Sequence, residues 1–366
     1  MKIPIFASQF RKDMKKISIG TILLSLLVMG LFPTGCKKPD DTDSTPYLSG
    51  SMTFDIPYYA RQGEKLTIRP YGVSHPEGGS MKVYAYGASP VTVALPDTII
   101  VTKGKIDKGD LSFTFTMPDS LGNFVLNCVA SADGYYSRSM SADVTVISPE
   151  IGMSITGSGI DRDDAAIIDD RTSELTGERT YYYTTIGDLD WFRNNLAYTE
   201  LGHPYLRCEV MSYVMGRYYT YEEALAACPE GWRLPTEEEW IALGKVITGK
   251  DTKPGETIEG AAGALMADMY FNGEKMWEFW PAVKITNQTK LAVLPAGYAD
   301  VSGESPVFSG GNEYAAFWTA TPDGEGKAFY RYINVNKPDI FSGSADTQSL
   351  ALSVRCVRKT ESTSDQ

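Results

Sequence analysis

The sequence predicts an N-terminal all-β sandwich followed by an α+β domain with two short helices and long loops. Short segments of alternating apolar and polar residues dominate up to residue 149. The part from residue 150 onward contains two capped helix starts and all six tryptophans, from Trp191 to Trp318. A length of 366 residues and a hydrophobic content of 43% are enough for two domains with their own cores.

The overall charge excludes one class of partner. The chain has 34 Lys+Arg against 46 Asp+Glu, which gives a formal net charge of -12. Binding to nucleic acid requires a basic face, so we expect no nucleic-acid partner. Five cysteines and two histidines also provide little material for metal or thiol chemistry.

Residues 1–35 have the pattern of a lipoprotein signal peptide. Three lysines between residues 12 and 16 precede the uncharged segment Ile17–Pro33, and small residues follow. The segment Phe32-Pro-Thr-Gly-Cys36 resembles a bacterial lipobox, so Cys36 is the expected lipidation site and would attach the protein to a membrane. The alternative is ordinary secretion, with Cys36 removed or left as a free thiol.

Residues 36–46 form a predicted polar tether, because most of them are charged, Pro, Ser or Thr. An acidic run just after a lipidated cysteine resembles the surface-export signal of Bacteroidetes-type lipoproteins. We therefore expect a lipid-anchored protein of the outer membrane, exposed at the cell surface. The alternatives are a simple solvated spacer and a domain that faces the periplasm. Residues 361–366 are expected to be a disordered tail.

Residues 47–149 are predicted to form an immunoglobulin-like β-sandwich that serves as a spacer or stalk. About seven strands in about 100 residues is typical of that architecture. Turn residues separate the period-two segments, which include 65–68, 81–86, 111–116, 124–130 and 144–147. Because Phe124, Leu126, Cys128 and Ala130 alternate along one strand, we expect Cys128 to be a buried small hydrophobe.

Two helices are predicted in the second half from their capping boxes. Thr220 with Glu223 begins a helix that reaches Ala227, and Thr236 with Glu239 begins another. The second helix has an apolar face formed by Trp240, Leu243 and Ile247. Acidic pairs such as Asp163/Asp164 and Glu237/Glu238 are interpreted as solvated or capping groups, not as acid–base machinery.

A series of motifs in this half carries a family resemblance. The motifs include Gly231-Trp-Arg-Leu-Pro-Thr236, Leu294-Pro-Ala-Gly-Tyr298, Phe317-Trp-Thr-Ala320 and Ser353-Val-Arg-Cys-Val357. Their order and spacing resemble the Fibrobacter succinogenes major paralogous domain from about Tyr181 to Arg358. That family is similar to the formylglycine-generating fold, a variant of the C-type lectin-like fold. The resemblance therefore implies a C-type lectin-like domain over residues 150–360.

The resemblance also implies a disulfide between Cys228 and Cys356. An exported protein can hold such a bond, which would connect the first helix to the last strand. Cys208 would then remain as an unpaired thiol.

The same resemblance raises the question of catalysis. Formylglycine-generating enzymes need a pair of redox-active cysteines shortly before the closing motif, and residues 319–354 contain neither Cys nor His. His75 and His203 fall in different predicted domains, which disfavours a Cys/His dyad or a zinc site. We expect no catalytic residue, no enzyme activity and no cofactor.

The acidic stretch Asp161–Asp170 is a candidate calcium site. Its five aspartates could supply several of the oxygen ligands that calcium needs. Their spacing is not that of an EF-hand loop, and the Glu-Pro-Asn and Trp-Asn-Asp motifs of calcium-dependent lectins are absent from the sequence. We therefore predict no metal site and keep calcium at this stretch as the alternative.

A binding surface is the remaining functional hypothesis. Aromatic residues gather toward the C-terminus, at Trp277, Trp280, Tyr298, Tyr314, Trp318, Tyr330 and Tyr332. Motif position places Trp232, Trp240 and Trp318 in the core, and we select Trp277, Trp280 and Tyr332 as exposed ligand-binding residues. The predicted function is non-catalytic binding of a glycan or an extracellular protein. The alternative is a structural or adhesive-assembly subunit of the cell envelope without a small ligand.

Overall fold

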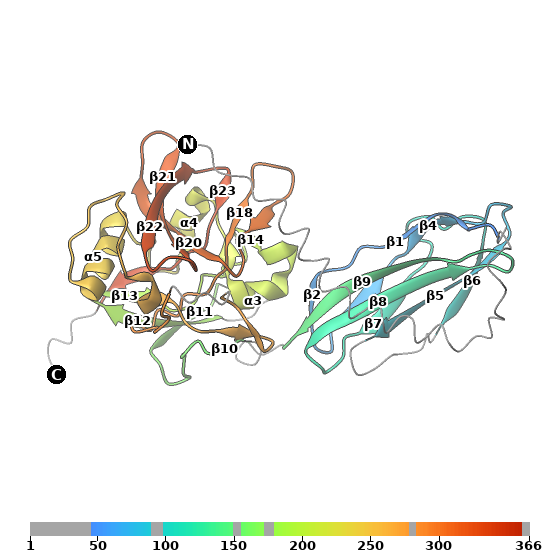
Figure 1. The fold of residues 1–366 in the computed structure, drawn as a ribbon, viewed down its shortest axis with the longest axis horizontal. Helices are drawn as coiled ribbons and strands as arrows, with labels where there is room; N and C mark the ends of the chain where they lie inside the picture. The colour runs from blue at the N-terminus through green and yellow to red at the C-terminus, as the bar shows by residue number, and fades with distance from the viewer. Residues whose placement is uncertain (1–44, 89–97, 149–154, 172–178, 278–282, 361–366) are drawn as a thin grey trace. The chain divides into compact units, whose positions relative to one another are not determined.

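The computed structural model describes residues 45–88, 98–148, 155–171, 179–277 and 283–360, and this part of the chain is mostly β-structure (Figure 1). The predicted lipidation site Cys36, the signal peptide, most of the tether, Trp280 and residues 361–366 lie outside these ranges. Within them, no helix has both the length and the apolar character needed to cross a membrane.

The N-terminal region, residues 45–148, consists of strands. They are β1 (Ser49–Thr53), β2 (Tyr59–Arg61), β3 (Lys65–Ile68), β4 (Tyr71–Ser74), β5 (Ser80–Ala88), β6 (Ile99–Lys103), β7 (Phe113–Thr116), β8 (Gly122–Ser131) and β9 (Arg138–Ile147). Five of them form a sheet in the order β2-β9-β8-β5-β6, in which only the β2–β9 pair is parallel. The pairs β1-β4 and β3-β7 form two further small sheets.

Alternation along β8 builds the core of this region, as the sequence predicts. Phe124, Leu126, Cys128 and Ala130 are all buried and belong to one apolar cluster with Val83 of β5. Burial raises the pKa of the Cys128 thiol to about 12, so it stays protonated and acts as a small apolar side chain.

The C-terminal region, residues 155–360, has short strands and long connections. Its first strands are β10 (Ile155–Thr156), β11 (Ala166–Asp169), β12 (Arg179–Ile186), β13 (Leu189–Phe192), β14 (His203–Pro204), β15 (Arg217–Tyr218), β16 (Tyr270–Phe271) and β17 (Glu274–Lys275). Its last strands are β18 (Tyr298–Asp300), β19 (Val307–Ser309), β20 (Tyr314–Pro322), β21 (Lys327–Asn334), β22 (Ile340–Asp346), β23 (Leu350–Ala351) and β24 (Val357–Lys359). The sheets of three or four strands have the orders β11-β12-β13-β24, β20-β21-β22, β19-β18-β23 and β10-β16-β17.

Both predicted helices are present and begin at their capping boxes. They are α4 (Tyr221–Ala227), capped by Thr220, and α5 (Glu237–Thr248), capped by Thr236. Gly249 ends α5 in the left-handed conformation that glycine adopts without strain. The short elements α3 (Ser212–Met215), α6 (Ala262–Leu265), η2 (Tyr205–Arg207) and η3 (Glu209–Met211) were not predicted. Four residues or fewer leave too little pattern to detect.

The sheet β20-β21-β22 separates two environments because its side chains alternate between its faces. On one face, Phe317 and Ile333 join Trp240 of α5 and Trp191 of β13 in an apolar cluster. On the other face, Trp318 packs with Tyr221 of α4, at a ring-centroid distance of 5.5 Å. The predicted core positions of Trp232, Trp240 and Trp318 are confirmed, with exposed fractions of 8%, 1% and 0%.

Candidate ligand-binding site

Trp277 is a core residue, so the expectation that it forms an exposed binding site is wrong. Its exposed fraction is 0%, and it packs in the same cluster as Trp240. The indole Nε1 donates a hydrogen bond to the carbonyl oxygen of Val293 at 3.3 Å. Burial of a large indole ring stabilises the fold when its N–H group has a hydrogen-bond acceptor inside the protein. Trp280, the second selected residue, lies outside the described part of the chain.

Tyr332, the third selected residue, lies half-buried on β21. Antiparallel pairing sets it opposite Ala316 of β20 and Phe341 of β22. Tyr330, two residues earlier, shares its face and is opposite Trp318 and Gly343. The face that carries the buried Trp318 therefore becomes partly exposed where Tyr330 and Tyr332 lie.

Five half-buried aromatic side chains form a continuous set around Tyr332, which we call the tyrosine platform. Its members are Tyr298, Tyr314, Tyr330, Tyr332 and Phe341. The ring centroid of Tyr332 lies 5.1 Å from that of Phe341, 5.7 Å from that of Tyr330 and 6.5 Å from that of Tyr314. These separations are typical of favourable aromatic pairs, so each ring is held by its neighbours.

Two glycines make room for the platform rings. A Cβ atom on Gly343 would lie 2.4 Å from Cζ of Tyr330, and one on Gly310 would lie 3.0 Å from Cδ2 of Tyr314. Gly310 also has a φ of +70°, so both the backbone conformation and the available space at this position favour glycine. The four tyrosines of the platform are among the aromatic residues that the sequence shows gathered toward the C-terminus, whereas Phe341 was not predicted. Alternation along residues 340–346 with pairing to Tyr332 is the signal that could have found it.

The platform is neutral at its rings and negative at one end. Burial raises the pKa of Tyr330 and of Tyr332. The pKa of Tyr298 is also raised, mainly by burial and to a smaller extent by the neighbouring Tyr314 and Asp300. Their hydroxyl groups therefore stay protonated at physiological pH. Hydrogen bonds from the Ser302 hydroxyl at 2.6 Å and its N–H at 2.9 Å lower the pKa of Asp300, which stays ionised.

The platform rings differ from other partly exposed tyrosines of this region in their neighbours. The guanidinium of Arg171 lies 4.2 Å from the ring centroid of Tyr198, and that of Arg358 lies 4.9 Å from that of Tyr183. Among the described residues, no such cation lies over a ring of the platform. Its ring faces are thus not used for internal cation–π contacts.

A buried ion pair supports the opposite face of the same sheet. Arg331 of β21 and Glu237 of α5 form a two-pronged pair, with both side chains fully buried. Glu237 Oε1 also accepts from the N–H of Gly255 at 3.0 Å, and Arg331 Nη1 donates to the carbonyl oxygen of Glu256 at 2.7 Å. The interpretation of Glu237 as a solvated or capping group is therefore wrong. Its charge is matched by an arginine 94 residues away, which local sequence does not reveal.

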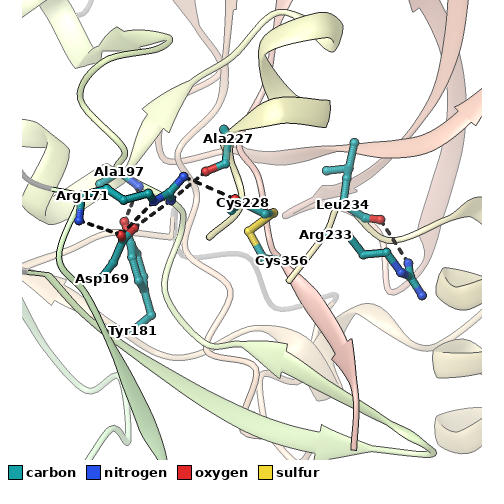
Figure 2. Close-up of a disulfide and its surroundings, with 9 residues drawn as sticks. All are labelled: Asp169, Arg171, Tyr181, Ala197, Ala227, Cys228, Arg233, Leu234 and Cys356. Atoms are coloured by element: carbon teal, nitrogen blue, oxygen red, sulfur yellow. Dashed lines mark hydrogen bonds and ion pairs between the residues drawn. A yellow bond between two sulfur atoms is a disulfide. The ribbon is translucent and has the colours of Figure 1, made fainter. Parts of the chain in front are cut away.

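The disulfide between Cys228 and Cys356 is present, with a Cα–Cα distance of 5.9 Å. Cys228 follows α4 and Cys356 precedes β24, so the bond connects the C-terminal end of this helix to the start of the last strand. Figure 2 shows Arg171 beside this bond, paired with Asp169 through two hydrogen bonds of 2.8 and 2.9 Å. Arg171 also donates hydrogen bonds to the carbonyl oxygens of Ala227 and Cys228, and these bonds hold the C-terminal end of α4 in place.

Arg355, next to the disulfide in sequence, is a fully buried cation held by uncharged oxygens. It donates to the side-chain oxygen of Asn195 at 2.7 Å and to the carbonyl oxygens of Phe192, Leu291 and Ala292 at 2.7 to 3.3 Å. Burial, with a smaller contribution from Arg193, lowers its pKa to about 9. The motif arginine therefore holds loop backbone in place and is not available to a ligand.

The acidic stretch Asp161–Asp170 uses carboxylates to anchor arginines. Asp164 accepts hydrogen bonds from the N–H of Asp161 and from Arg193, while Asp169 pairs with Arg171. In the described ranges, no group of three or more His, Cys, Asp or Glu side chains is arranged to hold a metal ion. Two of the five aspartates are thus engaged as ion-pair partners, which does not support the calcium alternative.

Among the described residues, the two unpaired thiols and the two histidines show no catalytic arrangement. Cys208 is buried, and burial raises the pKa of its thiol, as it does for Cys128. A reactive cysteine requires the opposite shift. His75 packs edge-on against Tyr135 of the N-terminal region, whereas His203 lies on β14 of the C-terminal region.

Comparison with known proteins places one family on this chain. Residues 184–358 match the model of the family described as Fibrobacter succinogenes major domain, and no curated protein matches the chain. Among solved structures, the CARDB domain of a Pyrococcus furiosus protein, in complex with di-metal ions, is 17% identical. The match covers 31% of this chain and 100% of that one, at a TM-score of 0.22, which is too low to support a conclusion about the fold. The residues that match this family model, 184–358, include the disulfide and the whole tyrosine platform.

Proposed function

We propose that this protein is a lipid-anchored, non-catalytic lipoprotein of the outer membrane whose C-terminal domain binds a glycan or an extracellular protein at the cell surface. The observation that carries the proposal is the tyrosine platform around Tyr332. Partly exposed aromatic rings with polar tips are enriched at binding surfaces. The proposal includes the C-type lectin-like fold for the binding domain and an immunoglobulin-like stalk before it.

The state of the cysteines supports a non-catalytic role. Formylglycine formation needs a pair of reactive thiols, but Cys228 and Cys356 are joined in a disulfide. The other two cysteines in the described ranges, Cys128 and Cys208, are buried and have raised thiol pKa values. We expect no formylglycine in a sulfatase-type cysteine peptide incubated with the protein, and its appearance would refute the non-catalytic proposal.

The membrane anchor is tested at Cys36. The Cys36→Ala variant should lose fatty-acid labelling and move from the outer-membrane fraction to the soluble fraction. Cys208→Ala is the control, because a buried internal thiol has no role in anchoring. If the Cys36 variant still fractionates with the outer membrane and the unaltered chain never takes up fatty acid, the lipoprotein proposal is wrong. Protease treatment of intact cells then tests surface exposure.

Ligand binding is tested with an array of glycans and extracellular proteins probed with the full chain. A ligand of the platform should bind the Tyr332→Ala variant at least tenfold more weakly, equivalent to about 1.4 kcal/mol. Tyr270→Ala is the matched control, because Tyr270 is an exposed tyrosine of the same region with an exposed fraction of 37%. An array on which the full chain binds nothing contradicts the proposed function.

A structural or assembly role is the second candidate, and β6 favours it. This strand ends the order of the five-stranded sheet, and its side chains Ile99 and Val101 are 57% and 64% exposed. Exposed apolar residues on an edge strand promote pairing between chains. An assembly subunit should sediment as an oligomer whose size depends on concentration, and Val101→Lys should abolish that association. A monomer at all concentrations would exclude this candidate.

A further inference from the structure

We infer that the tyrosine platform binds a neutral glycan chain. The inference rests on the proposed ligand-binding function and specifies the ligand class. It is carried by three properties of the platform, namely its hydroxyl groups, the filling of the space between its rings and the charge beside it.

In the described ranges, no hydrogen bond within the protein engages the hydroxyl of Tyr298, Tyr314, Tyr330 or Tyr332. By contrast, the hydroxyls of Tyr218 and Tyr221, on other elements of this region, donate to carbonyl oxygens. Each platform tyrosine thus has an apolar ring and a polar hydroxyl tip. A pyranose ring is complementary to this combination, because it has apolar C–H faces and a rim of hydroxyl groups.

The space between the rings is filled, which favours flat ligand groups. The ring of Tyr330 occupies the space above Gly343, and Ala316, opposite Tyr332, is 3% exposed. Neighbouring rings contact one another along the platform. Protein partners usually gain their affinity from anchor side chains that insert into desolvated pockets. A surface of mutually packed rings instead suits sugar rings that stack on it, so the observations favour a glycan over a protein.

The charge beside the platform disfavours an acidic ligand. Asp300 is ionised, and its charge raises the pKa of Tyr298, so a negative charge acts on this end of the platform. The chain as a whole has a formal net charge of -12. A uronic-acid or sialylated glycan would be repelled, whereas a neutral glycan would not. A basic peptide would also fit this charge, and it is therefore included in the test.

The test measures binding of the full chain, in detergent solution, to three classes of probe by titration calorimetry. The first is a panel of neutral oligosaccharides of glucose, mannose, galactose, xylose and N-acetylglucosamine. The second is a series of oligogalacturonates of the same lengths, and the third is a lysine-rich peptide. We expect at least one neutral oligosaccharide to bind at least tenfold more tightly than any probe of the other two classes. Its affinity should change little between low and high salt.

Three variants connect the binding to the platform. Tyr332→Ala should weaken binding of the neutral oligosaccharide at least tenfold, and Tyr332→Phe, which keeps the ring, should weaken it two- to fivefold. Tyr270→Ala should leave it unchanged. Tyr332→Phe keeps the test informative if Tyr332→Ala fails to fold, because the lost hydroxyl has no partner among the described residues.

Three results would overturn the inference. One is binding of no neutral oligosaccharide, and another is tighter binding of oligogalacturonate or the lysine-rich peptide. The third is unchanged affinity in folded Tyr332→Ala and Tyr332→Phe. If an acidic glycan or the peptide binds and Tyr332→Ala removes that binding, the neutral-glycan inference fails while the proposed ligand-binding function stands. If the broad array of glycans and proteins also yields no ligand, both fail.

Discussion

The N-terminal and C-terminal regions bury different kinds of side chain. In the N-terminal ranges that the structure describes, Ser148 is the one buried polar residue. The buried polar and charged residues of the C-terminal ranges are Asp169, Asp190, Arg193, Asn195, Ser212, Arg217, Glu237, Thr319, Arg331, Ser353 and Arg355. The difference follows from backbone pairing. Long strands such as β8 and β9 satisfy each other's backbone groups along their length, whereas long loops leave carbonyl groups that need other donors.

Buried arginines supply these donors in the C-terminal region. Arg355 donates to three carbonyl oxygens, and Arg193 donates to those of Gly159 and Lys290. Each arginine has five N–H groups, so one side chain can hold two or three loop segments together. Regular β-structure is therefore stabilised here by apolar packing, and irregular structure by cross-links between distant segments. Four predictions test this difference.

The largest effect is expected from removing the disulfide. The Cys228→Ala/Cys356→Ala double variant should lose about 4–5 kcal/mol of unfolding free energy by the chain-entropy model, because the bond closes a separation of 128 residues. All six tryptophans lie between Trp191 and Trp318, so tryptophan fluorescence during denaturant unfolding reports on the C-terminal region. The control is the Cys128→Ala/Cys208→Ala double variant, which also replaces two cysteines but keeps the disulfide. Mass mapping that finds Cys208 bonded to Cys228 or Cys356 would contradict the assignment.

The second effect is expected from breaking the buried ion pair. Arg331→Met should destabilise the C-terminal region by about 3–5 kcal/mol, because it leaves the carboxylate of Glu237 buried without a cation. The matched control is Arg233→Met, which removes a partly exposed partner of Glu239 and should cost about 0–1 kcal/mol. Arg331→Met/Glu237→Leu should recover much of the loss. Equal losses for Arg331→Met and Arg233→Met would show that burial does not distinguish the two pairs.

The difference between local and long-range contacts also separates the features that the sequence predicted from those that it missed. Alternation along 124–130 and the capping boxes at Thr220 and Thr236 are local patterns, and each element that they predict is present. The disulfide was implied by the family resemblance and is present. The partner of Glu237, the neighbours of Arg355 and the short helices α3 and α6 depend on residues far apart in sequence or on very short segments.

The candidate site was predicted in part for a related reason. Tyr332 is half-buried within an aromatic set, whereas Trp277, chosen by the same reasoning, is fully buried. Composition indicates that aromatic residues are numerous, but the register of β20, β21 and β22 decides which rings reach the surface. A tryptophan outside a long strand has no alternation from which to derive its direction, so the sequence could not separate Trp277 from Tyr332.

The third effect concerns the N-terminal region, where packing replaces cross-links. Leu126→Ala should cost about 2–5 kcal/mol, because Leu126 is fully buried among apolar side chains and its truncation leaves a cavity. Circular dichroism should show an earlier loss of β-structure. Tryptophan fluorescence should be unchanged, because the N-terminal region contains no tryptophan. If the fluorescence transition shifts by the same amount as the circular-dichroism transition, the two regions unfold as one cooperative unit. The expectation that they are stabilised separately would then be wrong.

The smallest effect concerns the pH dependence of one cross-link, the ion pair of Asp164 with Arg193. The hydrogen bond from the N–H of Asp161, together with Arg193, lowers the pKa of Asp164 below its ordinary value. A carboxyl whose folded pKa is lowered contributes stability above its unfolded pKa of about 3.9, and this contribution disappears as the pH falls through the folded pKa.

Asp164→Asn should therefore lower the stability of the C-terminal region at pH 7 by about 1 kcal/mol or less, since the carboxylate is partly exposed to solvent. Below about pH 4 the difference between the variant and the unaltered chain should shrink toward zero, because protonated Asp164 has lost the same charge. Fluorescence-detected denaturation from pH 7 to pH 2 measures this difference, with Asp163→Asn, at the exposed neighbouring position, as the control. A difference that stays constant down to pH 2 would mean that Asp164 acts by its shape and not by its charge.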